Sequence, residues 1–263
     1  MKFILSLILS CFYLNLAQAQ AQSNSWKDRV PVPVFEHNKA LVELYWVAWE
    51  QAFDHVKTQP GLPQSNYIDE AFWDDTIWIW DTCFMTLFCK YAQEDFPGTE
   101  SLNNFYVPLH GDIQNKSFPL NIQHPDNPPL FAWVEYDNYA FSNDSAHLNK
   151  LLNQTQYLQK HFEWFETAKK GWRFQSNASR RKMSRPVVLN KFKNGFFWNG
   201  VSSGMDNTPR KGGLWVDAIA QQGLSALYIS RLAEKSGNQS LAQKWKAKYD
   251  EIKIGYKKEG GDG

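Results

Sequence analysis

The chain has 263 residues, and its 28 basic and 27 acidic side chains give a formal net charge of +1. This balance argues against a nucleic-acid-binding protein, whose affinity comes largely from neutralising phosphates. A hydrophobic fraction of 43% argues against disorder, and the length allows one large globular domain or two small ones. The 12 Trp, 18 Phe and 11 Tyr residues either line a concave ligand site, such as a sugar site, or fill an aromatic core.

The first residues have the pattern of an export signal. A lysine at position 2 precedes an apolar run over residues 3–16, which is too short to cross a bilayer. Ala17-Gln18-Ala19 places small residues where signal peptidase reads them, so we expect a signal peptide over residues 1–19 and a periplasmic or secreted protein. Cys11 lies in a weak lipoprotein-like box after an unusually short run, and lipidation is not expected.

Helical periodicity dominates the rest of the chain. After an expected extended segment over residues 20–36, residues 37–58 place Leu41, Leu44, Val47 and Ala48 on one stripe, which is the spacing of an amphipathic helix. Asp144 or Ser145 is expected to cap a long helix. The other expected helices, in chain order, cover residues 80–93, 99–107, 128–141, 145–170, 214–235 and 240–256.

No run of residues alternates convincingly between apolar and polar, so the sequence predicts an all-α fold. Three long loops are expected between the helices, over residues 59–78, 110–127 and 171–213, and loops of this length are usually functional. No apolar segment after residue 19 approaches 18 residues, so no transmembrane segment is expected in the mature chain. Cys83 and Cys89, six residues apart on one helix, are not expected to form a disulfide.

Three familiar chemistries find little support. Residues 200–204 match G-x-S-x-G, but no histidine follows them, as the order of a serine hydrolase triad requires. The chain has no G-x-x-x-x-G-K-[ST] loop for phosphates. The six histidines are scattered, without an H-E-x-x-H motif, so neither a metal site nor a cofactor is expected.

Carboxylates among tryptophans remain as candidates for chemistry. A carboxylate in a loop is usually solvated or caps a helix, and Asp81 fits a helix cap. Asp206 stands out, because aromatic residues precede it and Arg210 follows four residues later. Such surroundings raise the pKa of a carboxyl, as a general acid requires. The other candidates are Asp74, Asp75, Asp112, Glu135, Asp137 and Asp217.

Several segments resemble glycoside hydrolase family 63, in particular its bacterial mannosylglycerate-hydrolase-like members, which are distantly related to trehalases. The segments are FWDDTIWIWDTCFMTLFCKYA, HPDNPPLFAWVEY, FFWNGVSSGMDNTPR and LWVDAIAQQGLSALYISRLA, and the resemblance covers about residues 67–256. It implies an (α/α)6 toroid with a site at the loop-bearing mouth. It also implies inverting hydrolysis of an α-linked glucosyl or mannosyl unit in an oligosaccharide or small glycoside.

The resemblance also implies roles for individual residues. Asp206 matches the general acid of the family, and Trp80 and Asp81 match a pair that holds the sugar hydroxyls. The other expected substrate contacts are Trp198, Gly204 and Arg210 in the acid loop, and His124 and Asn127 before the Pro-Pro pair.

The chain departs from the family pattern in one respect. The general base of the family is a glutamate far toward the C-terminus, and seven expected helices make only about the first half of the toroid. We therefore expect residues 37–263 to be the N-terminal part of a catalytic domain, inactive alone, or else to use an unexpected base such as Glu135. The alternative is a non-catalytic carbohydrate-binding protein or a degenerate remnant.

Overall fold

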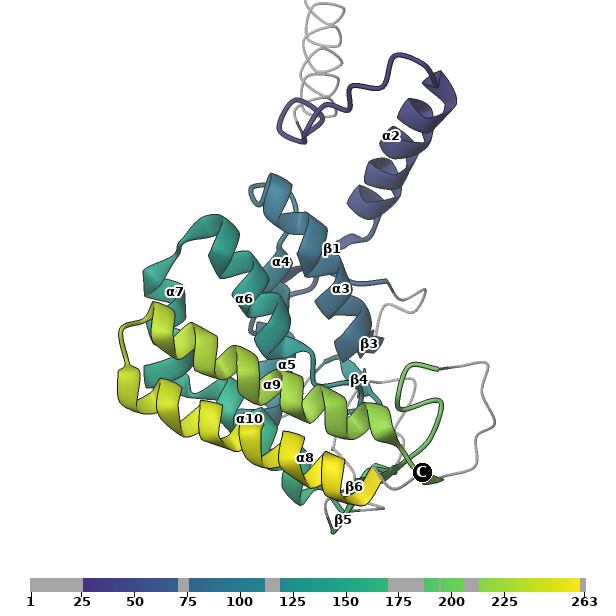
Figure 1. Ribbon diagram of the computed structural model, residues 1–263. Coiled ribbons are helices and arrows are strands. Elements are labelled where there is room, and N and C mark those ends of the chain that lie inside the picture. The colour runs from purple at the N-terminus through teal and green to yellow at the C-terminus, as the bar shows by residue number, and fades with distance from the viewer. Residues whose placement is uncertain are drawn as a thin grey trace, which may run out of the picture.

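The computed structural model describes residues 26–70, 76–111, 119–169, 187–193, 195–205 and 213–260, with side chains as far as 255 (Figure 1). Helices make up most of this part of the chain. They are α2 (Lys39–Asp54), α3 (Ile79–Cys89), α4 (Gly98–Ser101), α5 (Asn103–His110), α6 (Phe131–Ser142), α7 (Ser145–Asn149), α8 (Tyr157–Thr167), α9 (Val216–Lys235) and α10 (Gln239–Gly260), with short helical turns η1 (Lys90–Ala92) and η2 (Lys150–Thr155).

Within the described ranges, seven short strands form three small sheets. The strands are β1 (Val56–Thr58), β2 (Asn66–Ile68), β3 (Thr76–Trp78), β4 (Asn121–Gln123), β5 (Asn190–Phe192), β6 (Gly195–Trp198) and β7 (Gly213–Leu214). β1 pairs antiparallel with β2, β5-β6-β7 form an antiparallel sheet, and β3 pairs in parallel with β4. The parallel pair joins segments more than 40 residues apart, next to the start of α3.

The expected all-α toroid is wrong, because the structure mixes helices with these sheets. Most of the strands lie in the segments expected to be loops, and β1 lies in the last residues of the helix expected over 37–58. Each strand has only two to four residues. Strands this short do not show the alternation by which a sequence reveals a half-buried strand.

Several expected helix ends are confirmed. Asp144 caps α7, since its carboxylate accepts hydrogen bonds from the amides of Ala146 and His147 at 3.0 and 2.9 Å. Gly237 has a φ of +76° and ends α9, after which α10 runs back alongside it (Figure 1). The single helix expected over 145–170 is instead divided into α7 and α8 by the wider turns of η2 and by Gln156 at a φ of 56°.

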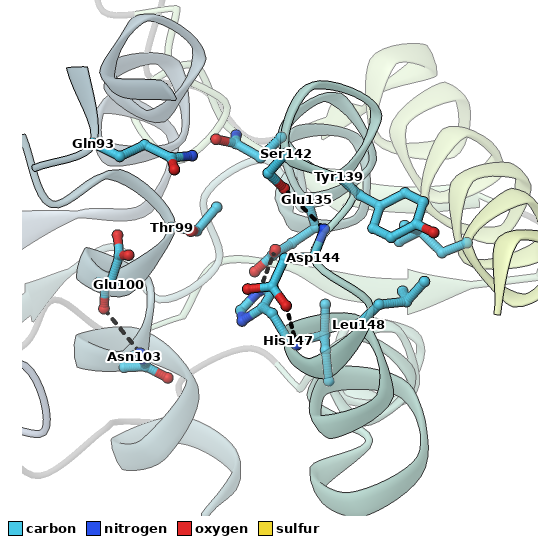
Figure 2. A pocket seen from close by; sticks show the side chains of 13 residues that line it. Gln93, Thr99, Glu100, Asn103, Glu135, Tyr139, Ser142, Asp144, His147 and Leu148 are labelled. Carbon is cyan, nitrogen blue, oxygen red and sulfur yellow. Dashed lines mark hydrogen bonds and ion pairs between the residues drawn. The ribbon is translucent and has the colours of Figure 1, made fainter. Parts of the chain in front are cut away.

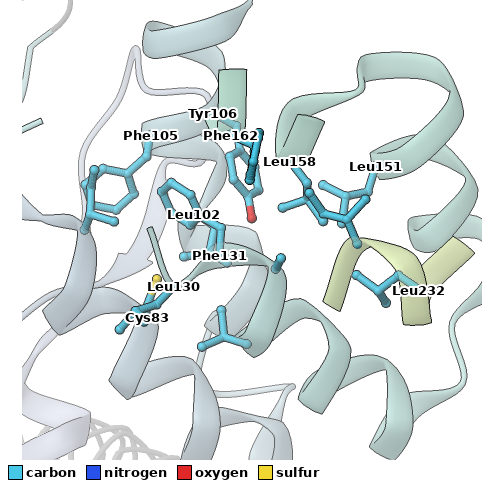
Figure 3. Packing of buried hydrophobic residues seen from close by; sticks show 14 of the residues in the cluster. Cys83, Leu102, Phe105, Tyr106, Leu130, Phe131, Leu151, Leu158, Phe162 and Leu232 are labelled. Atoms are coloured by element: carbon cyan, nitrogen blue, oxygen red, sulfur yellow. The ribbon is translucent and has the colours of Figure 1, made fainter. Parts of the chain in front are cut away.

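The main core lies between the helices that follow β3. α6 packs against both α3 and α9, and α8 covers α5 and α9. Figure 3 shows the apolar side chains that these helices contribute, with Phe131 close to Phe105 and Tyr106. A second cluster beneath β5 and β6 is built on Phe165, Phe196 and Trp198. This second cluster supports the loop that follows β6.

The apolar stripe expected on the first helix does not face the body of the protein. Leu41 and Leu44 on α2 are 51% and 61% exposed, whereas Trp49 is buried against Phe88 and Phe96. α2 therefore carries apolar side chains on two faces. The face with tryptophan contacts the body, since an indole buries far more area than a leucine.

Cys83 and Cys89 are both buried free thiols, as expected. Among the described residues, no helix combines the length and the apolarity that a membrane span requires.

A glycine allows the tight approach of α4 to α3. A Cβ atom added to Gly98 would lie 2.8 Å from the Cβ atom of Cys89, closer than such atoms approach in proteins. We expect Gly98→Ala to lower the free energy of unfolding by about 1–3 kcal/mol, because the two helices must separate. Gly213→Ala is the matched control, since its Cβ would meet only Trp215 at 3.9 Å. Equal losses of unfolding free energy in the two variants, measured by urea denaturation, would contradict this close packing of α4 on α3.

Candidate functional site

Three segments that are distant in sequence meet near the start of α3. β3 leads directly into Trp80 and Asp81 in the first turn of α3. β4 lies parallel to β3, with Gln123 opposite Trp78, and so brings His124 and the residues after it to the same end of the helix. The third segment is the turn over residues 199–205, which follows β6. Together with β6, these segments carry six of the eight residues to which the family resemblance assigns a role.

The turn over residues 199–205 is held by its own polar groups. Asn199 accepts a hydrogen bond from the Ser202 amide through its side chain, at 2.8 Å, and one from the Ser203 amide through its carbonyl, at 3.0 Å. The Gly200 carbonyl accepts from the Met205 amide at 2.8 Å. These bonds define the path of the backbone through the S-G-M-D segment as far as residue 205.

Gly204 lies directly against the indole of Trp80. A Cβ atom at position 204 would lie 3.1 Å from two carbon atoms of the ring, and the φ of Gly204 is +82°. Both observations favour glycine, since a side chain would collide with the ring and L-residues rarely adopt this φ. The contact covers one part of the half-buried Trp80, whose ring also meets Phe84 edge-on at 5.6 Å.

The segment after β4 anchors this turn through side-chain contacts with Ser202. The side-chain amide of Asn127 donates to the Ser202 carbonyl at 2.8 Å, and the hydroxyl of Ser202 lies 3.5 Å from Nδ1 of His124. All three residues are buried. His124 adopts a φ of 46°, which directs the chain from β4 into this contact.

Asp126 is a residue that sequence analysis does not single out. Its carboxylate is fully buried and accepts hydrogen bonds from the amides of Val188 and Leu189 at 2.8 and 3.0 Å. Burial raises the pKa of this carboxyl, and the two amide donors oppose the shift. Its carbonyl also accepts from the indole nitrogen of Trp198 at 3.0 Å. Nothing in the sequence distinguishes Asp126 from an ordinary loop aspartate before Asn127.

The expected site residues thus fall into three groups. Trp80 and Asp81 are half-buried at the start of α3, and Gly204 contacts Trp80. Trp198, His124 and Asn127 are buried and support the turn, so in this arrangement they do not line an open surface. Asp206 and Arg210 lie outside the described residues, as do Asp74, Asp75 and Asp112.

The G-x-S-x-G segment does not form a nucleophile elbow. A short strand precedes it, but residues 201–204 form turns where the elbow requires a helix. Ser202 is fully buried beside His124 and is thus inaccessible to a substrate. The pairing of Ser202 with His124 is a structural contact.

Glu135 lies in a different place, in the first half of α6. Its buried carboxylate accepts a hydrogen bond from the Tyr106 hydroxyl at 2.9 Å and pairs with Nε2 of His147 at 2.8 Å. Figure 2 shows this pair in a cavity of about 100 Å³, with Glu100 on the opposite wall and Asp144 beside His147. The negative charge of Glu135 raises the pKa of His147 to about 9. Glu135 is therefore committed to an ion pair and is not placed to act as a base beside Trp80.

Two other histidines form a buried contact. Nε2 of His110 lies 2.9 Å from Nδ1 of His161, and burial lowers the pKa of His110 to about 3. Both rings are uncharged at neutral pH, because burial also lowers the pKa of His161. Within the described ranges, no group of three or more His, Cys, Asp or Glu side chains is arranged to hold a metal ion.

Comparison with known proteins yields a distant similarity. No family model matches the chain, and no solved structure matches it. An uncharacterized protein from Borreliella burgdorferi is 20% identical over 241 residues, a match that covers 84% of this chain and 44% of that protein. The chain thus spans less than half the length of this relative, whose description names no activity.

The Gly204 contact predicts an unequal effect of two glycine substitutions. Gly237 also has a positive φ, but a Cβ atom added there would have no neighbour within 4 Å, so Gly237→Ala tests backbone strain alone, at about 1–2 kcal/mol. Gly204→Ala adds a collision with Trp80. We expect it to cost more stability and to shift tryptophan fluorescence, which Gly237→Ala leaves unchanged. Identical behaviour of the two variants would refute the contact.

The Glu135–His147 pair predicts a pH-dependent contribution to stability. Because the pKa of His147 is raised from 6.5 to about 9, the pair stabilises the fold fully below pH 6.5 and is lost as the pH rises through 9. A third of the His147 side chain is exposed, so we expect only about 1–2 kcal/mol between wild type and His147→Gln at pH 6. Urea denaturation at pH 6 and pH 10 measures this difference in unfolding free energy between the two proteins. An equal difference at both pH values would contradict the stabilising role of the pair.

Proposed function

We propose that the chain forms the sugar-binding and proton-donating part of an inverting glycoside hydrolase that acts on an α-linked glucoside or mannoside. The observation that carries this proposal is the contact of Gly204 with Trp80. It joins the segment that the family resemblance assigns to the sugar hydroxyls with the loop that it assigns to the general acid, although the two are more than 120 residues apart in the sequence.

The side chains at the start of α3 suit a sugar. An indole presents a flat apolar surface to the C–H face of a sugar ring, and a carboxylate accepts strong hydrogen bonds from hydroxyl groups. Trp80 and Asp81 provide one of each and are both half-buried. Trp198, His124 and Asn127 support this proposal indirectly, since they fix the turn that presses on Trp80.

Asp206 is the proposed general acid, two residues after Gly204 in the sequence. In an inverting reaction, one carboxylic acid protonates the leaving oxygen while a second carboxylate, about 6.5–9.5 Å away, activates water. We assign the first role to Asp206 and no residue of this chain to the second. Glu135 does not fill it, because His147 and Tyr106 occupy its oxygens.

A second candidate function is sugar binding without hydrolysis. The observation that favours it is that Glu135 and Asp126 are both buried and already hydrogen-bonded, so neither of these carboxylates is open to a water molecule. Export from the cell, proposed from residues 1–19, suits both functions.

Substitution of Asp206 separates these functions. In the full-length protein that contains these residues, we expect Asp206→Asn to reduce hydrolysis of aryl α-glucosides and α-mannosides by at least about 100-fold and to leave sugar binding intact, because the amide fills the same space but carries no transferable proton. Asp217→Asn is the matched control, since the Asp217 side chain accepts from the Ala218 amide at the start of α9. Trp80→Ala should abolish binding itself.

Calorimetric titration with the two methyl glycosides, beside a chromogenic assay, reads out both properties. Binding without hydrolysis by the full-length protein supports the second candidate. A protein that shows neither binding nor hydrolysis of these glycosides would overturn the proposal. Hydrolysis that is undiminished in Asp206→Asn would overturn the assignment of Asp206 as the general acid.

A further inference from the structure

The exposed apolar side chains of the described residues are concentrated near α2. Of sixteen large hydrophobic residues that are exposed, seven lie within 22 residues of chain. Six of these form what we call the α2 surface: Val32, Val34, Phe35, Leu41, Leu44 and Val47. Phe53 is left out, because it lies on the opposite side of α2 from Leu44 and stacks on Trp26. Because each of the six is between 45% and 85% exposed, together they present an apolar area on the order of 600 Å².

An apolar area of this size lies at the upper end of what an isolated chain exposes. The largest apolar patch of a typical monomer is about 300–600 Å², and a stable protein interface buries about 800 Å² on each partner. The α2 surface therefore approaches the area that one side of a dimer interface needs. Leu41, Leu44 and Val47 form its helical part, as a raised stripe along the outer side of α2.

A groove of about 470 Å³ lies beside this stripe, between α2 and the end of α3. Ala48 and Ala52 leave it open on α2, and Trp49, Phe88 and Tyr91 form its aromatic walls. The hydroxyl of Tyr45, which also lines the groove, already donates to the Pro31 carbonyl. The groove thus offers large apolar walls, and its size suits a few leucine or valine side chains.

We propose that the α2 surface and this groove form an interface between two copies of the chain. In a twofold interface, the same patch of each copy contacts its counterpart on the other copy. The patch must therefore carry both a raised element and a recess that receives it. Ala48 belongs to the groove and lies one residue after Val47 of the stripe. Under a twofold axis near Ala48, the stripe of each copy enters the groove of the other.

The charges of α2 disfavour a membrane as the occupant. Helices that lie on membranes carry lysine and arginine along their polar face, which attracts anionic lipids. α2 has one lysine, Lys39, against Glu43, Glu50 and Asp54. A second protein copy requires no such basic face, since its contribution is apolar burial.

Light scattering coupled to size-exclusion chromatography tests the proposal on the full chain. We expect a mass twice that of the 30.5 kDa monomer, and we expect Leu44→Glu to weaken the affinity of the dimer by at least about tenfold. Ile254→Glu is the matched control, because Ile254 is 54% exposed on α10, away from the α2 surface, and should leave the dimer intact. A monomeric wild type, or a dimer unaffected by Leu44→Glu, would overturn the proposal.

A second variant separates a specific dimer from general stickiness. Ala48→Trp makes the surface more apolar but fills the groove, so it should produce monomers if the stripe enters the groove. Stronger association of Ala48→Trp would overturn the reciprocal fit, as would large open-ended assemblies of the wild type, which a closed twofold contact does not produce. Circular dichroism establishes that each variant retains the helical fold.

Discussion

The candidate site depends on a buried carboxylate, that of Asp126. A charged or neutral carboxyl inside a protein is stable only when nearby donors replace the water that it loses. Oδ2 of Asp126 obtains them from the amides of Val188 and Leu189, while the carbonyl of Asp126 accepts the indole N–H of Trp198. One residue of the segment after β4 thereby fixes both the start of β5 and the end of β6.

The position of the S-G-M-D turn follows from that constraint. With β6 fixed through Trp198, the next residues reach Asn127, which binds the Ser202 carbonyl, and two residues later Gly204 meets Trp80. The parallel pairing of β3 and β4 completes the arrangement, because it places Trp80 and Asp126 at the same end of α3. The proposed sugar-binding residues are thus held by contacts that link three distant parts of the chain.

Local signals in the sequence predict the features that local physics decides. Asp144 caps a helix through its neighbouring amides, and Gly237 ends one through its own backbone freedom, so both agree with expectation. The strands are not predicted from the sequence, because β3 and β4 have three residues each and form only through their pairing across more than 40 residues. The burial of Asp126 is not predicted for the same reason, since it depends on Val188, Leu189 and Trp198 far along the chain.

The stripe of Leu41, Leu44 and Val47 shows a further limit of sequence periodicity. The spacing identifies an apolar face correctly, but α2 has two such faces, and the one with Trp49 contacts the body. The roles of Trp80, Asp81 and Gly204 come from a family resemblance, and the structure adds the Gly204–Trp80 contact to it. Asp206 and Arg210 lie outside the described residues, and their roles stay predictions.

Sugar binding at Trp80 is tested most directly by hydrogen–deuterium exchange of the chain with and without a saturating methyl α-mannoside or methyl α-glucoside. If the sugar binds there, exchange slows in two segments, the start of α3 around Trp80 and the turn over residues 199–205, with little change in α10. Unchanged exchange in both segments with either sugar, or protection confined to other parts of the chain, would contradict binding at Trp80.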